Sequence, residues 1–339
     1  MFRFRCLPKF WRSTLGLPYF TELFLTNSIA RPRLLFAIQV DEELLFFSSP
    51  QPQNPADNST LVATPYNMSF PKDFEVDIRT TLSGQVFLCW RRKEGMIFNP
   101  VTGESTTITL PEVKAKGSVR RSYVGYDPIN KQFKVLCMSW SFYYWLLTLG
   151  STGKPLWRSI ECNINISVHK GAYIVGEIYI NGVVYSGAHY IEESCMIVCF
   201  DFSSEKFSFI KIDEGVLRGT LVNYKGKLGV LVKDDYHYQL VLWVLEEDAG
   251  VHKWSKSLCV QSRISLLERI GDYFHILGIT GAGEIVFTTY RQSDRFYIVY
   301  YNIESNTFAR VNIQGFEHFK DPYITPRIFL DYVENMKLL

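Results

Sequence analysis

The stretches "YINGVVYSG" (residues 179–187) and "VCFDFSSEKFSFIKI" (residues 198–212) decide the fold. In each stretch, residues typical of β-strands flank a short turn, centred on Gly182 in the first and on Ser204 in the second. The two turns lie 22 residues apart (204 − 182), as expected for two successive β-hairpins. The pair therefore predicts a unit of four antiparallel strands.

The same pair of turns recurs along the chain. First turns are predicted at Asp41, Gly84, Asn130, Gly182, Gly226 and Gly283, and second turns at Gly103, Gly153, Ser204, Gly250 and Ser305. Successive first turns are 43, 46, 52, 44 and 57 residues apart by subtraction. Propeller blades have four strands and repeat at about 40 to 50 residues. We therefore predict a mainly β, propeller-like domain of about six four-stranded blades over residues 33–313, with a two-layer β-sandwich as the alternative.

Three further features belong to this prediction. The segment "DPYITPRIFLDYV" (residues 321–333) is expected to supply a strand that pairs with the first blade and removes its open edge. Residues 48–60, rich in Pro and Asn, are predicted to form a long surface loop. An aromatic residue follows most second turns, and these aromatics are expected to pack between neighbouring blades: Trp157, Phe207, Trp254 and Phe308.

Composition limits the classes of partner and compartment. The 339 residues are 47% hydrophobic and carry a net charge of +2, which gives no overall field to attract nucleic acid or anionic lipid. Charged or polar residues interrupt every long apolar run, so no membrane-spanning helix is predicted. Seven scattered cysteines, an odd number, do not resemble a disulfide framework. We therefore expect a reducing compartment, cytoplasm or nucleus, and partners that are recognised locally.

Motifs for catalysis or cofactor binding are not recognisable. "GSTGKP" fails the phosphate-loop pattern at Thr148 and Pro155, and the glycines at 281 and 283 sit in a strand turn. In "HYIEESCMIVC", Cys195 and Cys199 would lie about 13 Å apart along one strand, too far for one tetrahedral zinc. We expect no metal and no cofactor. An enzyme with carboxylates converging at the centre of a propeller stays an alternative.

Two segments are candidate surfaces for a protein partner. "VKAKGSVRR" (residues 113–121) places four cations in a connection between blades, where they could contact an acidic partner: Lys114, Lys116, Arg120 and Arg121. "SWSFYYWLL" (residues 139–147) is rich in the aromatics that are enriched at interface hot spots: Trp140, Phe142, Tyr143 and Tyr144. The competing readings are a solvated loop for the first segment and alternating core positions for the second.

The N-terminal segment "RFRCLPKFWRSTLGLPYF" (residues 3–20) contains three Arg and no acid. A short helix is predicted from near Pro8 to Leu15, ending at Gly16, with Pro18 preventing its continuation. A mitochondrial transit peptide is one interpretation of this composition. The order "RFRC..K.WRS.....PYF" also resembles the second half of the F-box of plant F-box proteins. That resemblance implies adaptor-binding roles for Phe4, Cys6, Lys9, Trp11 and Pro18.

The rest of the chain is similar to the F-box-associated domain of the same family, on the phrases "RPRLLFAIQ", "GYDPINKQFKVLCM", "INGVVY" and "IVCFDFSSEKFSFIKI". The resemblance implies a partial F-box in residues 1–25 and an F-box-associated domain in residues 33–330. It also implies a substrate receptor of an SCF-type ubiquitin ligase, which binds a Skp-type adaptor, and through it cullin, and holds a protein to be ubiquitinated. No catalytic residue is implied, because ubiquitin transfer belongs to other subunits.

The sequence departs from the family pattern at the F-box itself. The first half of the F-box, with its Leu-Pro start, is not seen before Arg3, and Pro8 stands where the family has a small or apolar residue. Losing that docking area is expected to weaken or abolish adaptor binding. The alternative function is therefore a non-catalytic propeller module that binds a protein without recruiting the ligase.

Overall fold

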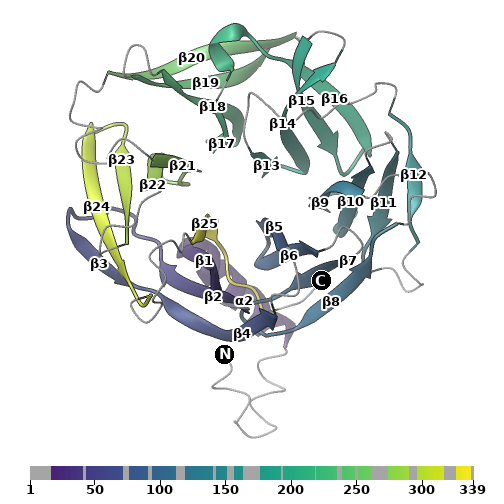
Figure 1. Ribbon diagram of the computed structural model, residues 1–339, viewed down its shortest axis with the longest axis horizontal. Helices are drawn as coiled ribbons and strands as arrows, with labels where there is room; N and C mark the ends of the chain where they lie inside the picture. Colours follow the sequence, from purple (N-terminus) through teal and green to yellow (C-terminus); the bar gives the residue numbers. More distant parts are fainter. Residues whose placement is uncertain are drawn as a thin grey trace, which may run out of the picture. The chain divides into compact units, whose positions relative to one another are not determined.

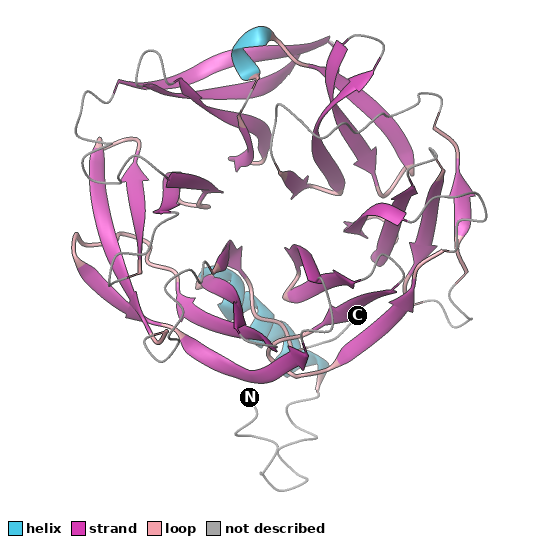
Figure 2. Ribbon diagram, in the orientation of Figure 1, coloured by secondary structure: helices cyan, strands magenta, loops and turns pink. Residues whose placement is uncertain are grey.

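The computed structural model describes residues 17–40, 43–71, 76–90, 94–111, 119–139, 143–150, 156–162, 176–191, 194–217, 219–234, 239–248, 251–261, 274–289, 296–316 and 326–336. Strands dominate these residues. Their helical segments are α2 (Pro18–Ala30) and a single 3-10 turn, η2 (Glu214–Val216), both drawn in cyan in Figure 2. The chain divides into unit 1 (residues 1–112, 289–301 and 305–339) and unit 2 (residues 113–288 and 302–304).

Unit 1 contains two complete four-stranded sheets. The first has the order β25 (Arg327–Tyr332), β1 (Arg33–Val40), β2 (Glu43–Pro50) and β4 (Thr64–Pro71). The second has the order β5 (Val76–Leu82), β6 (Gln85–Trp90), β7 (Glu94–Phe98) and β8 (Ser105–Thr109). In both sheets every neighbouring pair of strands is antiparallel.

Unit 2 contains three four-stranded antiparallel sheets. Their orders are β12 (Arg158–Ile160), β11 (Tyr144–Thr148), β10 (Gln132–Ser139), β9 (Val119–Asp127); β13 (Glu177–Ile180), β14 (Val183–Ile191), β15 (Ser194–Asp201), β16 (Lys206–Lys211); and β17 (Thr220–Tyr224), β18 (Lys227–Asp234), β19 (Gln239–Asp248), β20 (Val251–Gln261). The sixth sheet has five strands: β21 (Phe274–Ile279), β22 (Glu284–Thr289), β23 (Tyr297–Asn302), β24 (Thr307–Gln314) and β3 (Ser59–Val62).

The predicted hairpin turns are confirmed wherever they fall among the described residues. Gly84, Asn130, Gly182, Gly226 and Gly283, and likewise Gly103, Ser204 and Ser305, each separate two neighbouring strands of one sheet. Asp41, Gly153 and Gly250 lie outside the described residues. The β13–β14 turn shows the local cause, because Asn181 and Gly182 both have positive φ (49° and 89°), as a two-residue hairpin turn requires.

Segments from the two ends of the chain complete the sheets of unit 1. β25, drawn in yellow, pairs antiparallel with β1, drawn in purple, and confirms the predicted strand at residues 321–333 (Figure 1). The predicted loop at residues 48–60 is too long, since Ser49 is fully buried within β2 and Ser59 begins β3. β3 pairs parallel with β24, so this part of the loop instead covers the edge of another sheet.

The cores lie between successive sheets within each unit. In unit 1, Leu35, Phe46, Leu88 and Phe98 belong to one buried cluster formed by the two four-stranded sheets. In unit 2, two of the four predicted aromatics bridge neighbouring sheets. The Phe207 ring lies 4.9 Å from the ring of Tyr144, and Trp254 Nε1 donates a hydrogen bond to the Lys211 carbonyl at 2.9 Å.

For the other two aromatics, packing between neighbouring blades stays a prediction. The Phe308 ring packs on Tyr301 of its own sheet, with ring centroids 4.5 Å apart, and Trp157 is half-buried.

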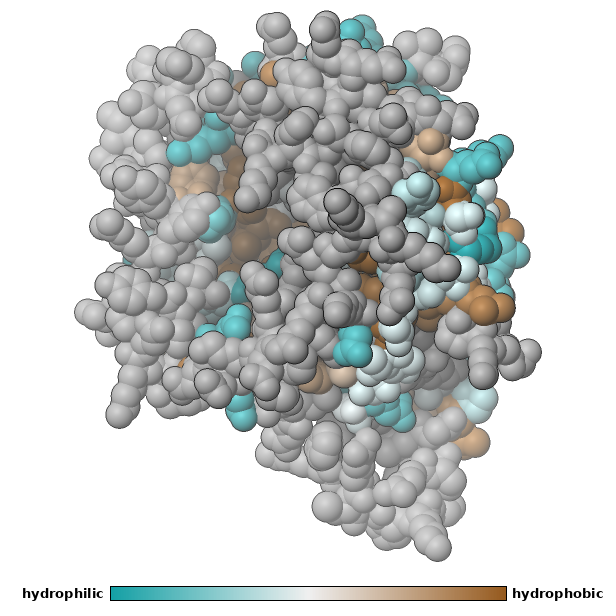
Figure 3. All heavy atoms as spheres, turned by 45° about the vertical axis from the view of Figure 1, so that its right-hand side comes forward, coloured by the Kyte–Doolittle hydropathy of each residue, from teal (hydrophilic) through white to brown (hydrophobic). Residues whose placement is uncertain are grey.

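On the face drawn in Figure 3, hydrophilic side chains of the described residues (teal) stand at the surface, and hydrophobic ones (brown) also appear at its right-hand edge.

Candidate docking site around helix α2

Helix α2 begins at Pro18, a position where proline is favoured because its missing N–H would have no partner in the first turn. The sequence pattern does not predict this helix, and the helix that it does predict, over residues 8–15, lies outside the described residues. Thr21 is the buried residue of α2, and its hydroxyl donates a hydrogen bond to the Pro18 carbonyl at 2.9 Å. Only Arg31 and Pro32 separate α2 from β1, so the helix is joined to the first sheet without a long linker.

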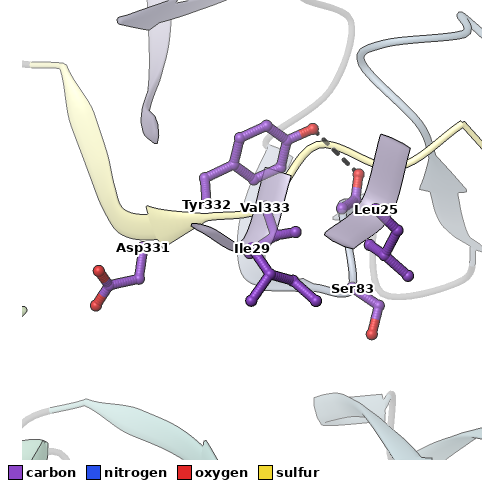
Figure 4. Close-up of a pocket in the computed structure, with 7 residues that line it drawn as sticks. Leu25, Ile29, Ser83, Asp331, Tyr332 and Val333 are labelled. Carbon is purple, nitrogen blue, oxygen red and sulfur yellow. Dashed lines mark hydrogen bonds between the residues drawn. The ribbon is translucent and has the colours of Figure 1, made fainter. Parts of the chain in front are cut away.

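A pocket of about 260 Å³ lies where α2 meets the sheets of unit 1 (Figure 4). Leu25 and Ile29, one helical turn apart, line it from α2. The β5–β6 turn and the end of β25 supply the remaining lining residues, Ser83, Gly84, Asp331, Tyr332 and Val333. Among the described residues, the lining contains one carboxylate and one aliphatic hydroxyl but no histidine, lysine or cysteine. It therefore resembles a packing contact more than a site for acid–base or nucleophilic chemistry.

The C-terminal segment holds the floor of this pocket in place. The Tyr332 hydroxyl donates a hydrogen bond to the Gly84 carbonyl at 3.1 Å, the bond dashed in Figure 4. Asn335 Nδ2 donates to the Ser83 carbonyl at 3.1 Å. Gly84 has φ +81°, and an added Cβ would lie 2.6 Å from Cβ of Asn335, so the turn requires glycine for both conformation and space.

Contacts from Gln51 and Tyr66 hold Asp331 and Glu334 in place. Gln51 donates from Nε2 to the Asp331 carboxylate at 2.6 Å and accepts from the Asp331 backbone N–H at 2.8 Å. The Tyr66 hydroxyl donates to Glu334 at 2.7 Å. Burial, and next the Glu334 charge, raise the pKa of Tyr66 far above its usual range, so its hydroxyl stays a donor. The segment after β25 is thus held by hydrogen bonds between Glu334 and Tyr66 and between Asn335 and the β5–β6 turn.

The outward side of α2 presents apolar side chains. Tyr19 is 77% exposed and Leu23 is 47% exposed, and their spacing of four residues places them on one face. Leu17, just before the helix, is also exposed. Of the adaptor-binding residues predicted from the sequence, Pro18 starts this helix, and Phe4, Cys6, Lys9 and Trp11 lie outside the described residues. Tyr19 belongs to the F-box-like stretch of the sequence, but neither Tyr19 nor Leu23 was among the predicted adaptor-binding residues.

The predicted aromatic surface is divided by the structure. Trp140 and Phe142 lie outside the described residues. Tyr143 is 55% exposed and its ring lies 6.0 Å from that of Trp145. The prediction that Tyr144 belongs to an exposed surface needs correction. Its side chain is only 3% exposed, belongs to β11 and packs in the core cluster of unit 2. Strand alternation explains the difference, since successive side chains of a strand point to opposite faces.

The predicted cationic surface is also only partly described. Lys114 and Lys116 lie outside the described residues, while Arg120 and Arg121 belong to strand β9 and not to a connection. Arg121 is half-buried, and its guanidinium donates a hydrogen bond to the Ser186 hydroxyl at 3.4 Å. Ser186 also bonds the buried Tyr123 hydroxyl at 2.8 Å. Arg121 is therefore committed, at least in part, to contacts between β9 and β14.

A buried ion cluster in unit 2 was not predicted. Lys134 Nζ contacts the carboxylates of Asp127 at 2.7 Å and Glu205 at 2.8 Å, and the Phe202 carbonyl at 2.8 Å. Arg158 forms a salt bridge with the second oxygen of Glu205. The cluster joins the β9–β10 turn to the β15–β16 turn. The sequence does show an Asp-Pro turn followed by a lysine. The partner Glu205 lies 71 residues after Lys134, however, and neither segment alone indicates that the two side chains meet.

Burial and hydrogen bonding oppose each other in this cluster. Burial raises the pKa of Asp127, but hydrogen bonds from Lys134, Asn130 and Ser203 outweigh it and hold the pKa well below the usual range. Burial likewise lowers the pKa of Lys134, and its bonds to Asp127 and Glu205 reverse the shift upwards. Asp127 and Lys134 are thus both charged at neutral pH. The bonds make this a structural cluster and not a reactive one.

Cys195 and Cys199 lie on one strand, β15, as predicted. Burial raises the pKa of the Cys199 thiol to about 12, and it also raises the pKa of Cys195. Within the described ranges, no group of three or more His, Cys, Asp or Glu side chains could hold a metal ion. No helix in the same part of the chain is long and apolar enough to cross a membrane.

Comparison with known proteins decides the family. Residues 33–333 match the family model described as the F-box associated beta propeller domain. The chain belongs to this family of F-box proteins. The six sheets are the blades of its propeller, which confirms the predicted fold class and blade number. One blade has five strands because β3 adds to it.

Two relatives from one plant match almost the whole chain. It is 47% identical over 350 residues to "Putative F-box protein At1g53370" of Arabidopsis thaliana, covering 99% of this chain and 88% of the relative. It is 43% identical over 362 residues to F-box protein DOR of the same plant, covering 99% and 89%. A solved structure titled as a nidogen/laminin complex is similar at a TM-score of 0.42 and 12% identity, covering 81% of this chain and 91% of that one.

Proposed function

We propose that this chain is a non-catalytic substrate-recognition subunit of an SCF-type E3 ubiquitin ligase. Residues 1–25 contact a Skp-type adaptor, which links the chain to cullin, and the β domain of residues 33–330 holds the protein to be ubiquitinated. Ubiquitin transfer belongs to other subunits, and no cofactor or nucleic acid takes part. We place the protein in the cytoplasm, the nucleus or both.

The observation that carries this proposal is the seating of α2 in unit 1. The helix follows the F-box-like segment in the sequence, lines a pocket together with the β5–β6 turn and the end of β25, and reaches β1 after two residues. Such a junction would set the direction in which the propeller presents a bound protein. The exposed apolar pair Tyr19 and Leu23 supplies a surface that an adaptor could cover.

Capture of the adaptor tests the proposal. The affinity-tagged chain is mixed with purified Skp-type adaptor and cullin, beside a Tyr19→Ser/Leu23→Ser variant. The matched control is Ile129→Ser, an apolar side chain in unit 2 that is 78% exposed. We expect the variant to lose about tenfold or more in affinity, because burying one such side chain contributes about 1.5 kcal/mol or more. The control should bind as the unchanged chain does.

A fusion with a complete F-box before Arg3 makes a negative result informative. If only the fusion captures adaptor and cullin, the chain is a propeller binding module and not a ligase subunit. A fluorescent fusion checks the compartment: import into mitochondria that is lost when Arg3, Arg5 and Arg12 are neutralised would favour the transit-peptide interpretation instead.

A further inference from the structure

The edge strands of the six sheets differ in how they are protected from pairing with another chain. Edge strands expose unpaired backbone groups, and charges, prolines or short length usually protect them. Most edge strands here contain a charge or a proline, namely β4 (Pro65), β5 (Asp77), β9 (Arg121), β12 (Arg158), β13 (Glu177), β16 (Lys206), β20 (Lys253) and β25 (Arg327). β17 and β21 contain none of the charged Asp, Glu, Lys or Arg side chains, but they lie against each other.

Two edge strands remain, β3 and β8. β3 has only four residues and itself covers the edge of β24. β8, with the sequence Ser-Thr-Thr-Ile-Thr, has five residues, no charge and no proline. Its pairing with β7 is regular over all five residues, without a bulge to twist it away. Among the described residues, β8 is thus the longest regular edge without such protection.

The backbone of β8 alternates between bonds to β7 and groups that point outward. Asn99 N–H donates to the Glu104 carbonyl at 2.8 Å, so this pair is a hydrogen-bonded one. Hydrogen-bonded and non-bonded pairs alternate along an antiparallel ladder. Thr106 and Ile108 therefore bond to β7, whereas the N–H and C=O groups of Ser105 and Thr107 point away from it. These outward groups of Ser105 and Thr107 are called the β8 edge below.

The side chains around the β8 edge suit an extended polypeptide. Ile108 is buried and anchors the strand, and Ser105, Thr106 and Thr107 are exposed. Glu104 precedes the edge with an exposed carboxylate, which accepts a hydrogen bond from the Thr102 hydroxyl at 3.3 Å. A basic residue beside Glu104 and uncharged residues opposite Ser105 and Thr107 would complement this surface.

A second copy of the chain fits the β8 edge less well. In antiparallel self-pairing about Thr107, Leu110 of the other copy would lie opposite Glu104. Residues 104–111, which include β8, contain no Lys or Arg, so a second copy would offer no basic residue beside Glu104. We propose that the β8 edge binds an extended segment of a partner protein, uncharged where it pairs with β8 and basic beside Glu104.

This inference names where the proposed receptor holds its protein substrate, and its biological meaning rests on that function. Peptide binding is nevertheless measured on the full chain alone, without adaptor, so the two proposals fail independently. The probe is a fluorescein-labelled synthetic peptide KTVTVK, followed by polarisation. A charge-swapped peptide ETVTVE and a proline-containing peptide KTPTVK serve as its controls.

The deciding variant is Thr107→Pro, which removes an outward N–H without removing a bond to β7. Thr107→Val retains that N–H and is the matched control, and thermal melting verifies that both are folded. We expect Thr107→Pro to weaken KTVTVK binding about three- to tenfold or more, as loss of one hydrogen bond and added steric hindrance predict. Thr107→Val should stay within about twofold. Glu104→Gln should reduce the preference for KTVTVK over ETVTVE.

Hydrogen exchange locates the bound peptide. The inference predicts that KTVTVK slows exchange at the amides of Ser105 and Thr107. Equal binding by Thr107→Pro and Thr107→Val, protection at another strand, or no binding of KTVTVK at about 1 mM would each overturn it. A dimer in sedimentation that Thr107→Pro dissociates would assign the edge to a second copy and would also overturn it.

Discussion

Lys134→Met is expected to lower the free energy of unfolding by about 3–5 kcal/mol, because it leaves a buried carboxylate without its cation. Asp127 is fully buried, and Lys134 Nζ lies 2.7 Å from it. The Asp127 carboxylate keeps other donors, including Asn130 Nδ2 at 2.8 Å and the Ser203 hydroxyl at 3.0 Å. These bonds satisfy its geometry but do not balance its charge, so most of the cost should remain.

The assay is urea unfolding followed by tryptophan fluorescence, with scanning calorimetry beside it. For a chain of 339 residues the loss corresponds to a Tm decrease of about 4–7 °C. Lys227→Met is the matched control, since Lys227 pairs with Glu246 at the surface and both side chains are largely exposed. It should cost about 1 kcal/mol or less. A loss below about 1 kcal/mol for Lys134→Met would refute the reasoning.

The pH dependence of stability tests the same Asp127–Lys134 pair. The pKa of Asp127 is lowered by folding, so its contribution is present above about pH 4 and is lost as pH falls towards the folded pKa. The pKa of Lys134 is raised, so its contribution is present below about pH 10 and is lost as pH rises further. In Lys134→Met the loss of the cation raises the pKa of the buried Asp127 carboxyl, so protonation relieves its uncompensated charge, and the stability difference from the unchanged chain should shrink as pH falls. A stability difference that stays the same at acid pH would argue against the pairing.

Two further predictions test the pocket floor and the buried thiols. Gly84→Ala should cost about 2–4 kcal/mol, since positive φ and a 2.6 Å approach to Asn335 Cβ both oppose a side chain. Gly283→Ala, at φ +90° with nothing within 4 Å, should cost only about 1–2 kcal/mol in the same unfolding assay, and equal losses would contradict the packing argument. Cys199, with its thiol pKa raised to about 12, should resist iodoacetamide at pH 8 until the chain unfolds, as peptide mass mapping would show. Rapid native alkylation of Cys199 would disprove its burial.

The hairpins were predictable because each is a local event. A turn such as Asn181–Gly182 needs positive φ at both residues, and the sequence displays the two residue types that tolerate it beside β-prone runs. The closing strand β25 was predictable for a related reason, since a propeller needs a partner for its first blade. Both predictions required only neighbouring residues or the repeat itself.

Features that depend on distant segments were not predictable in this way. The parallel pairing of β3 with β24 joins Ser59 to Val311 across a Pro- and Asn-rich segment that by itself favours a loop. Tyr144 looked like its exposed neighbour Tyr143, and only the strand register places it in the core. The Lys134 cluster joins turns of two sheets, and no local pattern reports which carboxylates a lysine will meet. At the candidate docking site, helix α2 was not predicted, because Pro18 was interpreted as the residue that stops an earlier helix and not as the first residue of a new one.

Because the chain is synthesised from its N-terminus, β1 is made long before its partner β25. Ala37 and its partner Arg327 are 290 residues apart by subtraction (327 − 37), so the ribosome must translate all of unit 2 before the first sheet receives its last strand. At about 5–20 residues per second, the edge of β1 would wait roughly 15–60 s for that partner. During this interval the nascent chain offers an unpaired strand of hydrophobic sequence to any chaperone nearby. The time needed to translate residues 113–288 therefore accounts for most of the interval during which this edge of β1 lacks its partner.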